Sequence, residues 1–155
     1  MNIYQEHEFV DLGLPSGTLW ATCNVDASKP EDYGDYFSWD EGKTAAAKWG
    51  NGWSVPSMEQ WKELKENTKS TWTTRNGVKG RLYTASNGNS LFLPAAGYRW
   101  GDGLYYAGGD GNYWSSSLYT VYPDCAWYFY FYSGDAYVGY GYRDGGRSVR
   151  AVRES

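Results

Sequence analysis

Residues 9–25, FVDLGLPSGTLWATCNV, are the stretch on which the interpretation of the fold depends. Residues 9–14 form a short apolar run that ends at Pro15-Ser16-Gly17, a strong turn signal. Residues 18–25 form a second run, rich in side chains that favour extended structure. The pattern predicts two short strands separated by a turn.

Helix signals occur in the middle of the chain. Residues 57–60, SMEQ, match a capping box, in which the Ser57 hydroxyl and the Gln60 side chain satisfy the free amides at a helix start. Trp61 and Leu64 then share one face, and charged side chains cover the other. We expect Trp61 to anchor a core rather than to stack on a ligand. The alanines in residues 43–49 favour a second, shorter helical piece.

The remaining patterns indicate strands. Asn76-Gly77 predicts a hairpin between residues 72–74 and 81–85, because both turn positions tolerate a positive φ. Another turn precedes a strand at residues 90–93. In the aromatic run 126–132, AWYFYFY, alternation should direct the phenylalanines to the core and the tyrosines towards water. Residues 148–152 predict a closing strand. We therefore expect one α+β domain over residues 1–155, with one or two helices packed on short antiparallel strands and long loops.

Composition excludes several classes of protein. The net charge is −4 and no basic stripe is present, which argues against nucleic-acid binding. No apolar run approaches the length of a membrane span, and the first residues lack the regions of a signal peptide, so the chain is either cytosolic when made or begins after a removed leader. With a single histidine and no Cys/His spacing, we expect no metal and no cofactor. Cys23 and Cys125 are expected to be free thiols, with Cys23 in the core.

The segment from residue 102 to residue 147 differs from the rest of the chain. It holds eleven of the sixteen tyrosines and no Lys, Glu, Gln, Met, His or Ile. Tyr, Ser, Gly and Asp dominate engineered and antibody-type binding sites, where tyrosine gives a large contact area at low entropy cost. The segment is therefore interpreted as a binding face carried on a scaffold that is formed mostly by residues 1–100.

Five motifs carry a resemblance to a known family. They are residues 9–21, residues 52–61 (GWSVPSMEQW), residues 93–99 (LPAAGYR), residues 113–117 (YWSSS) and the closing residues 143–152. In this order they resemble the Fibrobacter succinogenes major paralogous domain family, common in Bacteroidetes. That family is similar to the C-type lectin fold, in the branch related to formylglycine-generating enzymes. The resemblance implies neighbouring terminal strands, helices on a central sheet, a loop-rich binding region and a location outside the cell, on a cell surface or on a phage particle.

Some members of this family are variable proteins of diversity-generating retroelements. A reverse transcriptase miscopies adenines of a template repeat, and the altered Asn codons never encode Trp, Lys, Glu, Gln or Met. The residue types missing from segment 102–147 fit this origin, with Trp114 and Trp127 expected as scaffold. The resemblance implies a non-enzymatic protein that binds a protein or glycan ligand. The alternative is a fixed, lectin-like surface module of the same family. The candidate ligand-binding residues are Asp102, Tyr105, Tyr106, Asp110, Tyr119, Tyr122, Asp124, Tyr128, Tyr130, Tyr132, Asp135, Tyr137, Tyr140 and Tyr142, and Leu118 and Cys125 are further positions expected to vary.

The sequence gives weaker support for a catalytic function than for a binding function. Neither cysteine matches the active-site context of the formylglycine-generating branch, and the lone His7 offers no catalytic triad. The neighbouring carboxylates Asp40 and Glu41 are interpreted as a solvated loop, and the aspartates of the Tyr-rich segment match no calcium loop. The closing arginines Arg143, Arg147 and Arg150 are expected to form ion pairs or carbonyl bonds beneath the binding loops.

Overall fold

The computed structural model describes residues 2–154. The fold is α+β and its sheets are antiparallel. In the first half of the chain the elements are β1 (Asn2–Tyr4), β2 (His7–Asp11), β3 (Leu19–Ala21), α1 (Trp39–Ala47), α2 (Met58–Asn67), β4 (Thr68–Arg75) and β5 (Val78–Ala85). In the second half they are β6 (Ser90–Pro94), β7 (Tyr98–Trp100), β8 (Gly103–Tyr105), β9 (Gly111–Leu118), β10 (Cys125–Phe131), β11 (Ala136–Tyr142) and β12 (Val152–Arg153).

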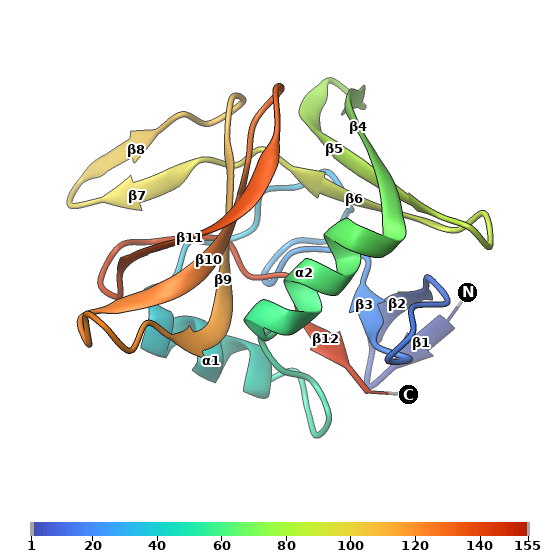
Figure 1. Ribbon diagram of the computed structural model, residues 1–155, viewed down its shortest axis with the longest axis horizontal. Coiled ribbons are helices and arrows are strands. Elements are labelled where there is room, and N and C mark those ends of the chain that lie inside the picture. The colour runs from blue at the N-terminus through green and yellow to red at the C-terminus, as the bar shows by residue number, and fades with distance from the viewer. Residues whose placement is uncertain (1, 155) are drawn as a thin grey trace.

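The strands form four small sheets, and the helix α2 lies among three of them (Figure 1). The sheet β1-β2-β3-β12 joins the two ends of the chain, since Trp20 of β3 pairs with Val152 of β12. The sheet β4-β5-β6 and the sheet β11-β10-β9 lie on different sides of α2, and the hairpin β7-β8 extends from the molecule beside β9–β11. Among the described residues, no helix is long and apolar enough to cross a membrane.

The N-terminal strands are shorter than the sequence predicts. The turn at residues 15–17 is present, with the Gly17 amide donating to Leu14 O at 2.9 Å. Strand β2 ends at Asp11, however, and β3 ends at Ala21 rather than at residue 25. After Ala21 the chain bends because the side chain of Asn24 turns inward, where it donates to Tyr33 O and accepts from Arg150. As a result Cys23 is half-buried instead of lying in the core, and both cysteines are free thiols.

Both helices begin at a serine capping box. The predicted box of α2 is confirmed: Ser57 accepts from the Gln60 amide and Gln60 Oε1 accepts from the Ser57 amide. Helix α1 starts earlier than the alanine run suggests, because Ser38 and Glu41 form a second box. The interpretation of residues 40 and 41 as a solvated loop is therefore wrong, since Asp40 and Glu41 lie in the first turn of α1.

Trp61 of α2 is the centre of the larger core. Its side chain is fully buried, as predicted, and its ring stacks on Phe129 of β10 with centroids 4.7 Å apart and planes 5° apart. Trp20 of β3 and Tyr113 of β9 pack against the same indole at 4.8 Å and 5.7 Å. Its Nε1 donates to Trp114 O at 3.1 Å. One side chain thus joins α2 to two different sheets.

A second core lies between α1 and the outer side of β9. It contains Trp39, Trp114 and Val149, all buried. Trp114 Nε1 donates to Phe37 O at 2.7 Å, and Trp39 Nε1 donates to Ser115 O at 2.8 Å. The buried indoles therefore keep hydrogen-bond partners, as buried polar groups require.

The end of the chain differs from a regular strand. Only Val152 and Arg153 form β12, although a strand over residues 148–152 was expected. Arg150 is fully buried and donates to Asn24 Oδ1, Ala21 O and Pro30 O. These bonds confirm that Arg150 is structural. Residues 148–151 also keep backbone bonds to Ala21, Val25 and β9 outside a regular strand.

Replacement of Trp61 by alanine should destabilise the fold by about 3–5 kcal/mol, because a large buried ring is lost and the cavity cannot collapse. Urea unfolding followed by circular dichroism measures the change. Trp100→Ala is the matched control, since Trp100 is 47% exposed and its loss should leave stability nearly unchanged. Equal effects of the two substitutions would contradict the assignment of Trp61 to the core.

The buried phenol of Tyr113 should make stability fall at high pH. Burial raises its pKa from 10.0 to about 12, and its hydroxyl donates to Pro94 O. The unfolded chain releases this proton near pH 10.0 and the folded chain near pH 12. The contribution of the protonated phenol to the free energy of unfolding is therefore intact below pH 10 and is lost as the pH rises towards 12. The loss should be about 3 kcal/mol.

The measurement is the urea midpoint of the parent protein and of Tyr113→Phe between pH 9 and pH 12. The variant should lose less stability over this range than the parent. Parallel curves for the two proteins would show that Tyr113 does not titrate as the structure implies.

Candidate functional site

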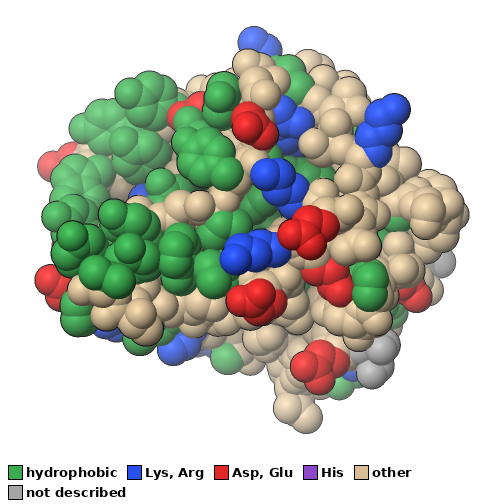
Figure 2. Space-filling view, in the orientation of Figure 1, with side chains coloured by type: hydrophobic (Ala, Val, Ile, Leu, Met, Phe, Trp, Pro, Cys, Tyr) green, Lys and Arg blue, Asp and Glu red, His purple; other side chains and the backbone are tan. Residues whose placement is uncertain are grey.

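Exposed apolar side chains concentrate in one part of the molecule. Apart from Ile3, every large hydrophobic side chain that is exposed among the described residues lies between residues 100 and 142. In Figure 2 they form a broad patch over the hairpin β7-β8 and the sheet β9–β11. A contiguous exposed apolar patch of this kind is typical of interaction sites rather than of ordinary surface.

The patch contains a groove, here called the aromatic groove, with a volume of about 660 Å³. Its walls are mainly tyrosine and tryptophan rings, and a few polar side chains lie among them. The lining residues are Tyr98, Trp100, Tyr106, Asp110, Asn112, Tyr128, Tyr130, Tyr137, Gly141, Tyr142, Gly145 and Arg147.

The floor of the groove is the outer face of the sheet β9–β11. Strand register places Asn112, Tyr130 and Tyr137 side by side across the three strands. The next row on this face holds Trp114, Tyr128 and Gly139. The opposite face of β10 carries Phe129 and Phe131, both fully buried, which confirms the predicted alternation. One face of the sheet therefore serves the larger core, and the other forms the groove and, at Trp114, part of the second core.

The hairpin β7-β8 forms a wall of the groove. Tyr98 of β7 stacks on Tyr105 of β8 with ring centroids 5.5 Å apart, and Tyr106 packs beside them at 6.1 Å. The hairpin is fixed to the end of the chain by reciprocal bonds of 2.8 Å between Arg99 and Gly146. The wall is therefore tied to the scaffold through its backbone, and its side chains remain free to contact a ligand.

Arg147 lies in the floor and has no acidic partner. Its guanidinium carbon is 4.5 Å from the Trp114 ring centroid and 4.2 Å from that of Tyr128, and the residue is 9% exposed. Burial lowers its pKa, with Tyr128 partly opposing the effect, but an arginine still carries its charge at neutral pH. The expected carbonyl bond is weak, since Nη1 is 3.5 Å from Tyr142 O.

Glycines make room for this guanidinium. A Cβ built on Gly141 would lie 2.6 Å from Arg147 Nη2, and one on Gly145 would lie 3.1 Å from Nη1. Any side chain at residue 141 would therefore displace the charged group. The two glycines and the arginine act as one unit in the floor of the groove.

Tyr130 and Asp110 form the polar contact of the groove. The Tyr130 hydroxyl donates to Asp110 Oδ2 at 3.1 Å. Burial, followed by this bond, raises the pKa of Tyr130, so the phenol stays protonated and remains a donor at neutral pH. Tyr128 and Tyr130 are both half-buried, and their removal would disturb the scaffold as well as the groove.

A second aromatic cluster lies at the end of the same sheet. Tyr119 stacks on Tyr140 with centroids 4.0 Å apart and planes 7° apart. Trp127 packs edge-on against both rings, and Tyr122 completes the group. Trp127 is thus half-buried in this cluster, although it was expected to serve only as scaffold. Tyr142 connects the two sites, because it lines the groove and also a smaller cavity beside Tyr122.

The structure brings together most of the predicted residues, in two places. Six of them line the aromatic groove: Tyr106, Asp110, Tyr128, Tyr130, Tyr137 and Tyr142. Tyr119, Tyr122 and Tyr140 form the second cluster, and Tyr105 packs on the wall through Tyr98.

The other predicted residues lie elsewhere. Asp102 is exposed in the turn between β7 and β8, and Tyr132 and Asp135 lie in the turn after β10. Asp124 is exposed before β10. Cys125 is buried as the first residue of β10 rather than lying in a loop, while Leu118 is exposed at the end of β9.

The groove also contains residues that the sequence did not suggest. Tyr98 and Trp100 precede the Tyr-rich segment, and Asn112 and Arg147 have polar side chains that pattern analysis assigns to scaffold or surface. Their burial within an aromatic surface follows from strand register, for which the sequence carries no local signal.

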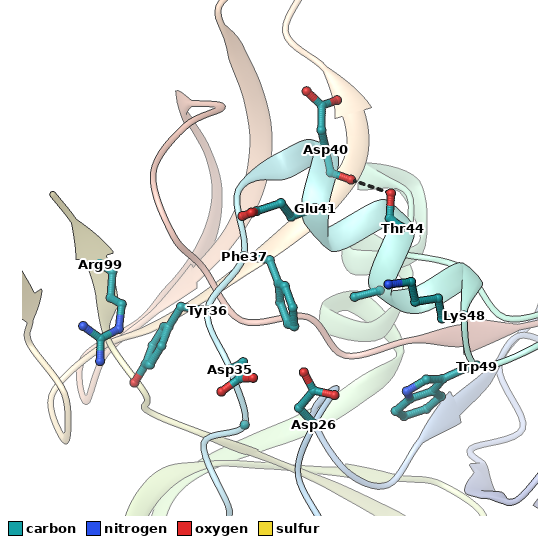
Figure 3. A pocket seen from close by; sticks show the side chains of 12 residues that line it. Asp26, Asp35, Tyr36, Phe37, Asp40, Glu41, Thr44, Lys48, Trp49 and Arg99 are labelled. Carbon is teal, nitrogen blue, oxygen red and sulfur yellow. Dashed lines mark hydrogen bonds between the residues drawn. The ribbon is translucent and has the colours of Figure 1, made fainter. Parts of the chain in front are cut away.

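A separate polar cavity of about 780 Å³ lies beside α1 (Figure 3). Asp26 and Asp35 face the same space, with Lys48 and Trp49 on its other side. Burial, followed by the hydrogen bond to Asp35, raises the pKa of Asp26. Asp40 also lines this cavity, but its partner lies outside it. Both of its carboxylate oxygens accept from Arg143 at 3.1 Å, which confirms the expected ion pair of Arg143.

Among residues 2–154, no group of three or more His, Cys, Asp or Glu side chains is placed to hold a metal ion. The His7 ring stacks on the Trp49 ring with centroids 3.6 Å apart.

Comparison with protein-family models found no match, and comparisons with curated proteins and with solved structures likewise found none. The geometry of the aromatic surface therefore carries the functional argument.

Gly141→Ala should lower stability by about 1–3 kcal/mol, because the new methyl group overlaps Arg147 Nη2 in a packed site. Gly139→Ala is the matched control in the same strand, since its Cβ would lie 3.4 Å from Tyr128, an ordinary contact. Thermal unfolding of both variants tests this pair. Equal stability of the two would show that the guanidinium is not held where the structure places it.

Proposed function

We propose that the protein is a non-enzymatic ligand-binding domain with a C-type lectin-like fold, and that the aromatic groove and the adjoining cluster are its contact surface. The observation that carries the proposal is the confinement of exposed large apolar side chains to residues 100–142. A solvated surface has no need for this arrangement, and a binding surface gains affinity from it.

The chemistry of the surface suits recognition. Tyrosine and tryptophan bury large areas with few rotatable bonds, and they are enriched among the residues that dominate binding energy. The tyrosine hydroxyl groups are polar and lie at the rim of the groove, where they can select a ligand by hydrogen bonding. Backbone pairing of β7-β8 and β9–β11 holds the rings in place before binding, which lowers the entropy cost of association.

Several features support the lectin-like fold and a diversified origin. The pairing of β3 with β12 brings the ends of the chain together, as the family resemblance implies. Tyr113 and Trp114 are fully buried, whereas exposed positions such as Tyr106, Tyr137 and Tyr142 carry the residue types that adenine mutagenesis can produce. Variation at the exposed positions would change the ligand and leave the cores intact.

A fixed lectin-like module for a glycan is the second candidate. Stacked tyrosines such as Tyr119 and Tyr140 offer flat apolar faces that also suit a sugar ring. In either case the ligand is a protein or glycan on another surface, and the domain acts outside the cell, on a cell surface or on a phage particle. Nucleic acid is a poor ligand for a domain of net charge −4.

The binding surface can be tested with Tyr106, Tyr137 and Tyr142, which are exposed and can be changed together to serine. We expect ligands selected by the parent protein, from a random-peptide display library or a glycan array, to be lost by this triple variant. Its stability should change by no more than about 0.5 kcal/mol per site, because these are surface substitutions.

The control is the triple variant Lys62→Ser, Lys65→Ser and Glu66→Ser on the exposed side of α2. It should keep every ligand of the parent. Ligands that bind the tyrosine variant as well as the parent would place the site elsewhere, and turnover dependent on Cys23 or Cys125 would make the protein an enzyme.

The diversified origin predicts a second, non-coding copy of the DNA for residues 97–150 beside a reverse-transcriptase gene, differing mainly at adenines. Sequencing of the genomic neighbourhood tests this. A neighbourhood without the repeat, together with a reproducible sugar ligand, would favour the fixed module.

A further inference from the structure

Two buried hydrogen-bond donors in the floor of the aromatic groove have no partner among the described residues. They are Asn112 Nδ2 and Arg147 Nε. Asn112 is 2% exposed and Arg147 is 9% exposed, yet both line the groove. A buried donor without a partner is costly to the fold, so a site that keeps two of them side by side in one cavity needs an explanation.

Arg147 is also a buried charge without a counter-ion. The salt bridges formed within residues 2–154 are Arg75–Glu31 and Arg143–Asp40, and neither includes Arg147. Trp114 and Tyr128 compensate for part of the lost solvation through their ring faces. In the plane of the guanidinium, Nη1 makes only a long bond of 3.5 Å to Tyr142 O and Nε has no partner among the described residues. In-plane N–H groups are the ones that bind a carboxylate.

Asp110 lines the same groove but is not the missing partner. Its carboxylate accepts from the Tyr130 hydroxyl and lies beyond salt-bridge distance of Arg147. The glycines at 141 and 145 keep the guanidinium in the floor by leaving space for it. The groove therefore presents a fixed positive group within an aromatic surface.

The surroundings favour a protein as the source of the acidic group. Leu104 and Val121 are exposed near the aromatic surface, at 44% and 63%. Exposed aliphatic side chains of this kind match apolar residues of a protein better than they match a sugar.

We propose that the aromatic groove captures a carboxylate of a protein ligand, at a C-terminus or an acidic side chain flanked by apolar residues, and that Arg147 and Asn112 are the donors that bind it. The inference rests on the proposed function and adds the chemical class of the ligand. Arg147 supplies charge and direction, Asn112 supplies a neutral hydrogen bond, and the tyrosines enclose the apolar neighbours of the carboxylate.

The test uses the whole chain and three small probes: N-acetyl-L-phenylalanine, its carboxamide, and glucuronic acid. Nuclear magnetic resonance follows the Nε–Hε signal of Arg147 during each titration. We expect the phenylalanine carboxylate to shift this signal and to bind roughly tenfold more tightly than the carboxamide, because a charge-assisted bond is lost in the amide. It should also bind more tightly than glucuronic acid.

Two variants separate the roles of the donors. Asn112→Asp, nearly isosteric, places a negative charge in the groove and should weaken carboxylate binding roughly tenfold. Asn51→Asp is the control for net charge, since Asn51 is exposed in a turn, and it should bind like the parent. Arg147→Lys keeps the charge but loses the planar fork, and should bind roughly fivefold more weakly.

The titrations with small probes can fail separately from the selection of ligands by display or on a glycan array. Equal binding of carboxylate and carboxamide, both lost in Tyr137→Ala, would overturn the inference and leave the aromatic surface as a binding site. Tighter binding of glucuronic acid would overturn the choice of a protein ligand. If Arg147→Lys fails to fold, the probe comparison on the parent and the Asn112→Asp variant still decide the matter.

Discussion

The packing of Trp61 is the constraint on which the rest of the structure depends. Its indole touches Trp20 of the terminal sheet and Phe129 and Tyr113 of the sheet β9–β11, and its Nε1 bonds to the backbone of β9. A two-stranded hairpin is at best marginally stable alone, and sheets of three or four short strands need a packed hydrophobic face. A single helix with a large aromatic side chain supplies the common surface on which they pack. The start of α2 is fixed as well, since the Met58 amide donates to Ser117 Oγ of β9.

Buried arginines hold the parts that the aromatic core does not reach. Arg150 satisfies three oxygen atoms from the irregular segment that follows β3. Arg81 plays a comparable role at the end of β10, where it donates to Tyr132 O and Ser133 O. Each guanidinium serves several backbone carbonyls at once, so loops can be fixed without regular pairing. Arg147 differs from them, because its main neighbours are rings, its one carbonyl bond is long at 3.5 Å and its Nε has no partner among the described residues.

The two faces of the sheet β9–β11 differ in burial. The inward face carries Tyr113, Phe129 and Phe131, all fully buried. On the outward face, exposure increases from Asn112 of β9 through Tyr130 of β10 to Tyr137 of β11. This gradient has a consequence for the predicted site. Exposed residues such as Tyr137 can change at little cost to the fold, whereas Tyr128 and Tyr130 are tied to Arg147 and Asp110 and contribute to both tasks. The groove thus has a buried floor and more exposed residues at its rim.

Much of the local structure could be predicted from the sequence, because the signals are local. The Asn76-Gly77 hairpin has both central residues at positive φ, the Ser57 capping box begins α2, and the alternation of residues 126–132 sorts phenylalanine from tyrosine. The Tyr-rich composition also indicated the surface, and six of its predicted residues line one groove. Local signals failed where a distant contact decides the outcome. The strand after Thr18 ends early because Asn24 and Arg150 meet across the chain, and Trp127 leaves the core because Tyr119 and Tyr140 cover it. Composition by itself determined that tyrosine is concentrated between residues 102 and 147, and the alternation of residues 126–132 indicated which side chains of that strand face the core. Only the tertiary structure decided which tyrosines are accessible and that an unpaired arginine lies among them, because strand register and burial arise from contacts between residues far apart in the chain.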